Sequence, residues 1–254
     1  MFFTKTAYIG IDLTGKKAFN YAAVDEDLGL LALSSGELDD LLAFVGGQAS
    51  AVVAINAPAR PNQGRVRALL EAESLEKGTV SLRGVEMRMA EHELRQRGIK
   101  VAATPSHPRN CPSWMRSGFM LYEKLTGLGF VPYPADDANH QLLETHPQAA
   151  FIAMTGGDLF SASTLEGRLQ RQTILYDAGL NIRDGMEFFE EVTRYKLRQG
   201  ILPIEHLYDS TQLDALLAAY TAWLAATEPK STCALGDEDE GQVYLPVTEL
   251  KAKY

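Results

Sequence analysis

The sequence predicts an α/β protein whose first 60 residues follow the order strand-strand-strand-helix-strand. Three apolar segments, TAYIGIDLT, KAFNYAAVDE and LGLLALSS, are strand-like and are separated by spacers of only a few residues. Short spacers that contain Gly and Asp are typical of antiparallel hairpins. GELDDLLAFVGG repeats Leu and Val at helical spacing and ends at a Gly pair, a common helix stop. SAVVAINAP is a continuous apolar run, which indicates a buried strand in a parallel arrangement.

After Pro58 the pattern becomes more polar and more helical. Residues 60–84 are irregular, so we expect a loop or short helices there. Helices are predicted in GVEMRMAEHELRQRG, WMRSGFMLYEKLTGLG and most of residues 148–226, and strands in IKVAATP, FVPYP, HQLLETHP and twice in CALGDEDEGQVYLP. We expect one domain over residues 1–254, with residues 60–135 as an insertion or elaborated segment.

Composition excludes several classes of protein. The chain has 254 residues, of which 46% are hydrophobic, enough for a sizeable core. Two cysteines exclude a disulfide framework and a four-thiolate zinc site. No apolar run approaches the roughly 18–20 residues of a membrane helix, and the N-terminus lacks the pattern of a signal peptide. We therefore expect a soluble, cytoplasmic protein without a membrane partner.

The net charge of −9 is unevenly distributed. Residues 60–124 carry 12 Lys and Arg against 7 Asp and Glu, a net charge of +5, which leaves −14 for the rest. A basic segment on an acidic body is suited to an anionic ligand. The same composition also fits solvated helix faces with Glu/Arg pairs at helical spacing.

Two polar residues end predicted strands. Asp12 ends the first strand and Asn56 ends the strand that follows the first helix. Open α/β sheets bind ligands at the carboxyl ends of their strands, so neighbouring strands would bring both side chains together. Carboxylate and amide oxygens are ligands for hard cations. The structural alternatives are a turn-forming Asp12 and an Asn56 that caps the backbone before Pro58.

Further acids are candidates later in the chain. Glu144 ends the strand HQLLETHP, and His146 follows at a spacing that places both on one side of a strand. This pair suits metal binding or acid–base work, or else a strand-to-helix turn. Asp209 and Asp214 begin the helix STQLDALLAAY. Asp209 suits a helix cap, whereas Asp214 lies in an apolar stretch, where a bound cation would offset the cost of a buried carboxylate.

Seven segments carry a resemblance to a known family: YIGIDLTG, VVAINAP, RGVEMRMAEHELRQRGIKVAATPS, LLETHPQAAF, LEGRLQRQTILYDAGL, LDALLAAYTA and ALGDEDEGQVYLP. In this order they resemble the domain of unknown function 429, a family of predicted nucleases of the ribonuclease-H-like superfamily. The resemblance runs from about residue 6 to residue 246. It implies a mixed five-stranded sheet of β-β-β-α-β order with helices on both faces.

The resemblance also implies a site and a cofactor. Nucleases of this superfamily hold two divalent ions on carboxylates, here Mg²⁺ or Mn²⁺, and cleave phosphodiesters. The implied catalytic residues and metal ligands are Asp12, Glu144 and Asp214. Asp209 and Asn56, from their positions in the sequence, are further candidate metal ligands. The implied substrate-binding residues are Arg83, Glu86 and Arg168, which would contact phosphate or orient a carboxylate. His146, from its place beside Glu144, is a further candidate substrate-binding residue.

One residue departs from the family pattern. Members usually have Asp where this chain has Asn56, which removes one negative charge from the implied site. Glu144 would then substitute as a ligand, or the protein would bind without cutting. The alternatives to a nuclease are a noncatalytic nucleic-acid-binding or anion-binding protein on the same fold and an actin-like ATPase or kinase relative. The choice of DNA or RNA and the oligomeric state, a dimer included, stay open.

Overall fold

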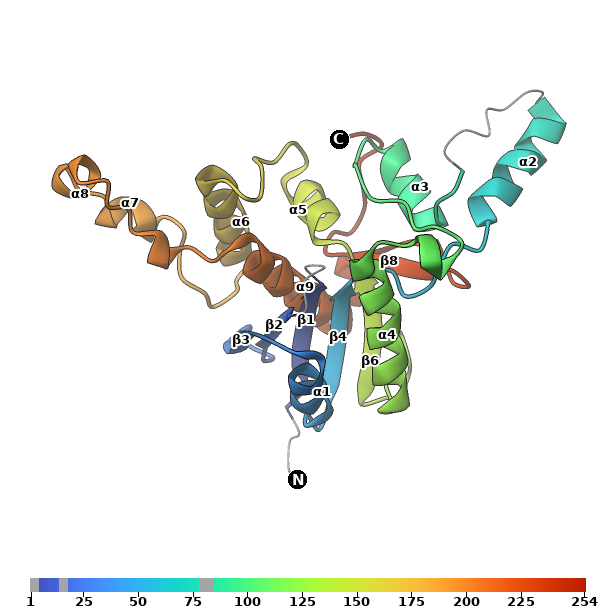
Figure 1. Cartoon of the computed structure of the whole chain (residues 1–254), viewed down its shortest axis with the longest axis horizontal. Coiled ribbons are helices and arrows are strands. Elements are labelled where there is room, and N and C mark those ends of the chain that lie inside the picture. The colour runs from blue at the N-terminus through green and yellow to red at the C-terminus, as the bar shows by residue number, and fades with distance from the viewer. Residues whose placement is uncertain (1–4, 14–17, 78–84) are drawn as a thin grey trace.

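The structure, a computed structural model, describes residues 5–13, 18–77 and 85–254, without the side chains of residues 75–77 (Figure 1). Within these residues eight strands form one mixed sheet of order β3-β2-β1-β4-β6-β8-β7, with β5 also paired to β6. The strands are β1 (Ala7–Leu13), β2 (Phe19–Val24), β3 (Leu30–Gly36), β4 (Ala51–Asn56), β5 (Val131–Pro132), β6 (His140–Thr145), β7 (Cys233–Asp237) and β8 (Gly241–Leu245).

The predicted β-β-β-α-β order at the start of the chain is confirmed. The strands β1, β2 and β3 form two antiparallel hairpins, and α1 (Leu38–Gly46) crosses over to β4, which pairs parallel to β1. The sheet is larger than the expected five strands. Both β5 and the β7–β8 hairpin pair with β6, on the side away from β4.

Helices cover both faces of the sheet. They are α2 (Arg65–Lys77), α3 (Met89–Gln96), α4 (Ser113–Gly127), α5 (Pro147–Thr155), α6 (Leu165–Asp177), α7 (Glu187–Glu191), α8 (Arg194–Arg198) and α9 (Ser210–Thr227), with short 3₁₀ turns at Pro108–Asn110, Ile204–His206 and Pro229–Ser231. The buried residues of α1 and α4 belong to one apolar cluster, and those of α3, α5, α6 and α9 to another. Among the described helices, none combines the length and apolarity needed to cross a bilayer.

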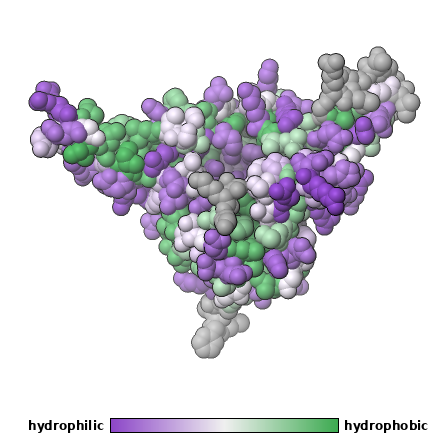
Figure 2. Space-filling view, in the orientation of Figure 1, coloured by the Kyte–Doolittle hydropathy of each residue, from purple (hydrophilic) through white to green (hydrophobic). Residues whose placement is uncertain are grey.

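Two helical projections extend beyond the sheet. Figure 1 shows α2 on one side of the molecule and α7 with α8 on the other. The second projection carries exposed apolar side chains, among them Phe189, Leu197 and Ile201, and Figure 2 shows hydrophobic surface on this arm. The first projection, α2, has 13 residues and lies within residues 60–84, where a loop or short helices were expected.

The segment IKVAATP is not a strand, which corrects the sequence-based expectation. Its polar backbone groups are bound by side chains of α3 instead of by a neighbouring strand. The Val101 carbonyl accepts from Arg95 Nη2 at 2.6 Å, and the Thr104 amide donates to Glu91 Oε2 at 2.8 Å. A backbone that is already hydrogen-bonded in this way does not need a sheet partner.

Register decides which face each strand-end residue occupies. Asp12 lies beside Asn56, whereas Glu144 lies beside Ile55, one position earlier along β4. Paired residues of parallel strands point to the same face, and neighbours along a strand point to opposite faces. Ile55 packs in the cluster of α1 and α4. Asp12 and Asn56 therefore point toward the α9 face, and Glu144 points to the opposite one.

Gly10 lets α9 approach β1 without an intervening side chain. A Cβ at Gly10 would lie 2.1 Å from both the Ala215 carbonyl oxygen and the Ala219 amide nitrogen. Gly10 precedes Asp12 by two residues and shares its face, while Ala215 follows Asp214 in α9. The missing side chain thus brings the backbone beside Asp214 close to the end of β1.

Gly10→Ala should destabilise the protein by about 1–3 kcal/mol or more, because backbone atoms of α9 must move to admit the methyl group. Urea unfolding measures the change. The matched control is Gly127→Ala at the end of α4, where no heavy atom lies within 4 Å of an added Cβ. Equal stability of the two variants would contradict the close packing of α9 on β1.

Candidate functional site

Asp12 is a buried carboxylate at the end of β1. Its side chain is 5% exposed, and Asn56 Nδ2 donates a hydrogen bond to Asp12 Oδ1 at 2.5 Å. Burial raises the pKa of Asp12 to about 6; the hydrogen bond from Asn56 opposes this shift and the charge of Asp209 adds to it. The strand ends predicted to lie side by side are therefore in direct contact.

Asp214 lies on the second turn of α9 and is partly buried. Burial is the largest cause that raises its pKa to about 8, and the negative charge of Asp12 is the next. Arg171 opposes the shift, and Asp209 adds a smaller repulsion. The charge of Asp12 thus acts against ionisation of Asp214.

Asp209 is the N-cap of α9. It is exposed, and its Oδ1 accepts hydrogen bonds from the Thr211 amide at 2.9 Å and the Gln212 amide at 2.8 Å. These bonds satisfy amides that begin the helix, as expected for a capping Asp. Asp209 therefore contributes negative charge to the Asp12–Asp214 pair from the edge of the site.

A buried cation that the sequence analysis did not single out lies near the pair. Arg171 of α6 is 1% exposed and donates to the Phe160 and Gly167 carbonyls and to Gln148. Burial lowers the pKa of Arg171, and the charge of Asp214 raises it. One feature of the sequence could have indicated that Arg171 is buried. It lies four residues from both Gly167 and Leu175, which places all three on one helix face.

Glu144 is held by an ion pair on the other face of the sheet. Arg88 Nη1 donates to Glu144 Oε2 at 2.9 Å, and Arg88 Nη2 binds Oε1. The Ala59 amide also donates to Oε2 at 2.9 Å. Burial raises the pKa of Glu144, while the adjacent Arg88 lowers it. The three acids expected to converge are therefore reduced to a pair, with Glu144 engaged elsewhere.

Arg88 and two further acids complete this second cluster. Arg88 is 2% exposed and also pairs with Glu91, which receives hydrogen bonds from Thr104. Glu240, which is fully buried, accepts from the Met89 amide at 2.9 Å and from amides at the start of α2. These bonds join α2, α3, β6 and the β7–β8 turn.

The expected substrate-binding residues do not gather at Asp12. His146 is the N-cap of α5, its Nδ1 accepts from the Ala149 amide at 3.2 Å, and burial lowers its pKa. Arg168 donates to the carbonyls of residues 207 and 208, just before α9. Glu86 is exposed beside the start of α2, and Arg83 lies outside the described residues.

His146 and Asn56 share a small cavity with Glu144. Its volume is about 30 Å³, and Trp114 also lines it. That volume is suited to one water molecule rather than to a substrate. Asn56 lines this cavity and also donates to Asp12.

The described part of the chain has no group of three or more His, Cys, Asp or Glu side chains placed to hold a metal ion. A family model described as "Protein of unknown function (DUF429)" matches residues 10–240. No curated protein and no solved structure matches the chain.

Proposed function

Because this chain belongs to the DUF429 family, which is described only as proteins of unknown function, we propose its activity from the site itself. The proposal is a phosphodiester hydrolase that depends on one divalent cation held by Asp12 and Asp214. The observation that carries it is the placement of these two carboxylates: Asp12 is buried at the end of β1, and Asp214 precedes Ala215, whose backbone lies against Gly10 of β1. Burial and then repulsion by the charge of Asp12 raise the pKa of Asp214 to about 8. A cation between them would convert this repulsion into attraction.

The strand order supports a ribonuclease-H-like core. The five strands β3-β2-β1-β4-β6 stand next to one another in that order, with α1 as the crossover to β4. Asp12 ends the central strand β1, and α9 carries Asp214 across the same face. A mixed sheet with acids at this edge is the arrangement that the family resemblance implies.

The donor set fits one hard cation. Mg²⁺ is commonly bound by one or two carboxylates, with water and substrate phosphate oxygens completing its coordination. Asp12 and Asp214 supply two carboxylates, and Asn56 already uses its amide nitrogen to orient Asp12. Glu144 has both oxygens bound by Arg88 and the Ala59 amide, so it is not proposed as a ligand.

Three further features of the chain would have separate roles around the bound cation. When bound, the cation supplies charge neutralisation for the phosphodiester and orientation for the attacking water. Asn56 holds one oxygen of Asp12, and among the described residues no hydrogen bond is made to the other. Asp214 is positioned by the backbone contact of α9 with Gly10. The positive charge of Arg171, which is itself buried, partly offsets the negative charge of Asp214.

A second candidate is binding of the same anionic ligand without cleavage. It is favoured by Asn56, which stands beside Asp12 where a third carboxylate would strengthen the site. Assays of cation binding and of cleavage separate the two candidates, because the noncatalytic protein would bind the cation and leave nucleic acid intact.

Titration of Mn²⁺ into the wild-type protein, followed by calorimetry, tests the cation site. We expect saturable binding at pH 8 and its loss, by at least about tenfold in affinity, in both Asp12→Asn and Asp214→Asn, because each removes half of the carboxylate charge. Asn56→Asp adds a carboxylate and should tighten binding. Cleavage of single-stranded DNA and RNA is measured with the same proteins.

The matched control is Asp136→Asn, which removes an exposed carboxylate on the loop before β6. Its Mn²⁺ affinity should equal that of the wild type. Unchanged binding in Asp12→Asn and Asp214→Asn, or none in the wild type, would refute the proposed site.

A further inference from the structure

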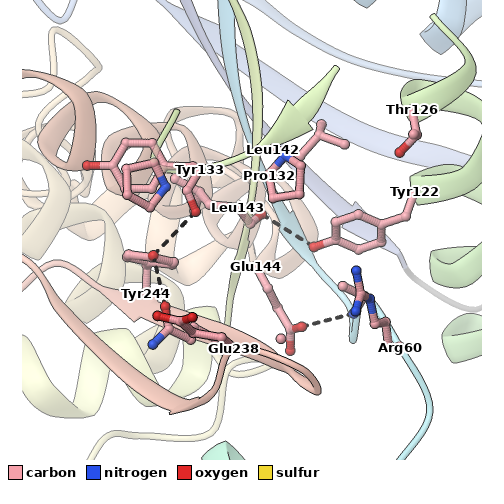
Figure 3. A pocket seen from close by; sticks show the side chains of 14 residues that line it. Arg60, Tyr122, Thr126, Pro132, Tyr133, Leu142, Leu143, Glu144, Glu238 and Tyr244 are labelled. Atoms are coloured by element: carbon pink, nitrogen blue, oxygen red, sulfur yellow. Dashed lines mark hydrogen bonds between the residues drawn. The ribbon is translucent and has the colours of Figure 1, made fainter. Parts of the chain in front are cut away.

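A pocket of about 460 Å³ lies along the outer side of β6, between the pairing positions of β5 and β8 (Figure 3). The strand β5 pairs with residues 141 and 142 of β6, and β8 pairs with residues 144 and 145. The pocket is further lined by α4 and by the segment that follows β4. Its volume is in the usual range for small-molecule sites.

Three tyrosines form much of the wall, and their hydroxyls are anchored. The Tyr133 hydroxyl donates to the Ala225 carbonyl at 2.5 Å, and the Tyr122 hydroxyl donates to the Leu143 carbonyl at 3.3 Å. The rings of Tyr133 and Tyr244 meet at 83° with centroids 5.2 Å apart. Anchored rings present a preformed aromatic surface, which suits a flat ligand.

Polar groups with unused hydrogen-bonding capacity border this surface. Figure 3 shows Arg60 near Tyr122 and Glu238 near Tyr244. Within the described residues the Glu238 carboxylate has no hydrogen-bond or ion-pair partner, and Arg60 uses only Nη1, which donates to the Asp239 carbonyl. Gln242 accepts from Tyr244, and its amide nitrogen has no hydrogen-bond partner in the part of the chain that the structure describes. The pocket thus offers donors and one strong acceptor around an aromatic wall.

We propose that this pocket binds a guanine base. Guanine presents N–H donors on its Watson–Crick edge, suited to the Glu238 carboxylate, and acceptors at O6 and N7, suited to the Arg60 guanidinium. Its flat ring suits stacking on tyrosine. Three charged residues line the pocket, and Glu144 among them is already paired with Arg88. The remaining charges, positive on Arg60 and negative on Glu238, match a neutral base better than a bare phosphate.

The base has two sources, a free nucleoside or an unpaired residue of a single-stranded nucleic acid. The second source rests on the proposed function, because it makes the pocket a substrate-recognition site of the hydrolase. Base binding itself needs neither a cation nor Asp12, so the two proposals are tested separately.

Calorimetric titration of guanosine, adenosine and uridine into the metal-free protein tests the pocket. We expect guanosine to bind at least about tenfold more tightly than the other two, and Glu238→Gln to lose about tenfold of that affinity, because a charged acceptor is lost. Glu249→Gln removes an exposed carboxylate outside the pocket and should bind guanosine as the wild type does.

Two single strands of five nucleotides distinguish the sources, one all thymine and one with a central guanine. Tighter binding of the guanine strand, lost in Glu238→Gln, would support recognition of nucleic acid; guanosine binding without this difference would support a free nucleoside. No saturable guanosine binding, or equal affinity for adenosine, would overturn the proposal. Guanosine binding by a wild type that fails to bind Mn²⁺ would overturn the proposed function alone.

Discussion

Asp214→Asn should stabilise the cation-free protein at pH 8, by several kcal/mol, and should have little effect near pH 4. The pKa of Asp214 is about 8 in the folded protein and 3.8 in its reference state. The folded state therefore binds more protons between these values, and its stability falls as pH rises from about 4 to 8. Four pKa units correspond to about 5 kcal/mol, an upper value because part of the repulsion is shared with Asp12.

Urea unfolding of both proteins with EDTA at pH 4.5 and pH 8 measures this effect. The difference between wild type and variant reports Asp214 together with its coupling to Asp12, because groups that do not interact with Asp214 titrate alike in both proteins. Asp136→Asn should show no such pH-dependent difference, since it removes an exposed carboxylate. A variant that is no more stable than the wild type at pH 8 would show that Asp214 is not a buried, repelled carboxylate.

The raised pKa of Asp214 also predicts how cation binding depends on pH. A carboxyl group with a pKa of about 8 is largely protonated at pH 6 and must lose its proton when a cation binds. Mn²⁺ affinity of the wild type should therefore rise between pH 6 and pH 8.

Arg88→Met should destabilise the protein by about 3–5 kcal/mol, because it leaves buried carboxylates without their cation. Arg88 is 2% exposed and forms ion pairs with Glu91 and Glu144, which are also buried. Its loss leaves Glu144, among the described residues, with only the Ala59 amide as a donor. Urea unfolding at pH 7 measures the change, with the exposed Arg109→Met as the matched control.

The double variant Arg88→Met/Glu144→Leu identifies the cause. It removes the Glu144 carboxylate that Arg88→Met leaves without its cation. Its loss of unfolding free energy should therefore be smaller than the sum of the losses in the two single variants. Mn²⁺ affinity should be unchanged in Arg88→Met, since Glu144 points away from Asp12. Loss of Mn²⁺ binding by a folded Arg88→Met protein would place the second cluster in the cation site and contradict the assignment.

Local features of the chain were sufficient to predict much of the fold. Short polar spacers predicted the β1–β2 and β2–β3 hairpins, and a Gly pair predicted the end of α1 near residue 46. The acidic turn near residue 239 predicted the β7–β8 hairpin. Asp12 and Asn56 were expected together because both end apolar runs, and parallel pairing of β1 with β4 places them in contact.

Contacts distant in sequence were not predictable in the same way. Arg88 and Arg171 resemble ordinary helical arginines in the sequence, yet both are almost completely buried beside carboxylates from other elements. The additional strands β7 and β8 join the sheet through only two residue pairs with β6. The pocket beside β6 exists because two separate strands pair with successive parts of the same edge.

The amino-acid sequence by itself determined which residues end strands, which segments form hairpins, and that Asp214 lies in an apolar helix. The tertiary structure alone decided that Asp12 faces Asp214 while Glu144 faces Arg88. The physical reason is register: side chains alternate along a strand, so a shift of one residue between neighbouring strands moves a carboxylate to the opposite face. Periodicity within one strand contains no information about that shift.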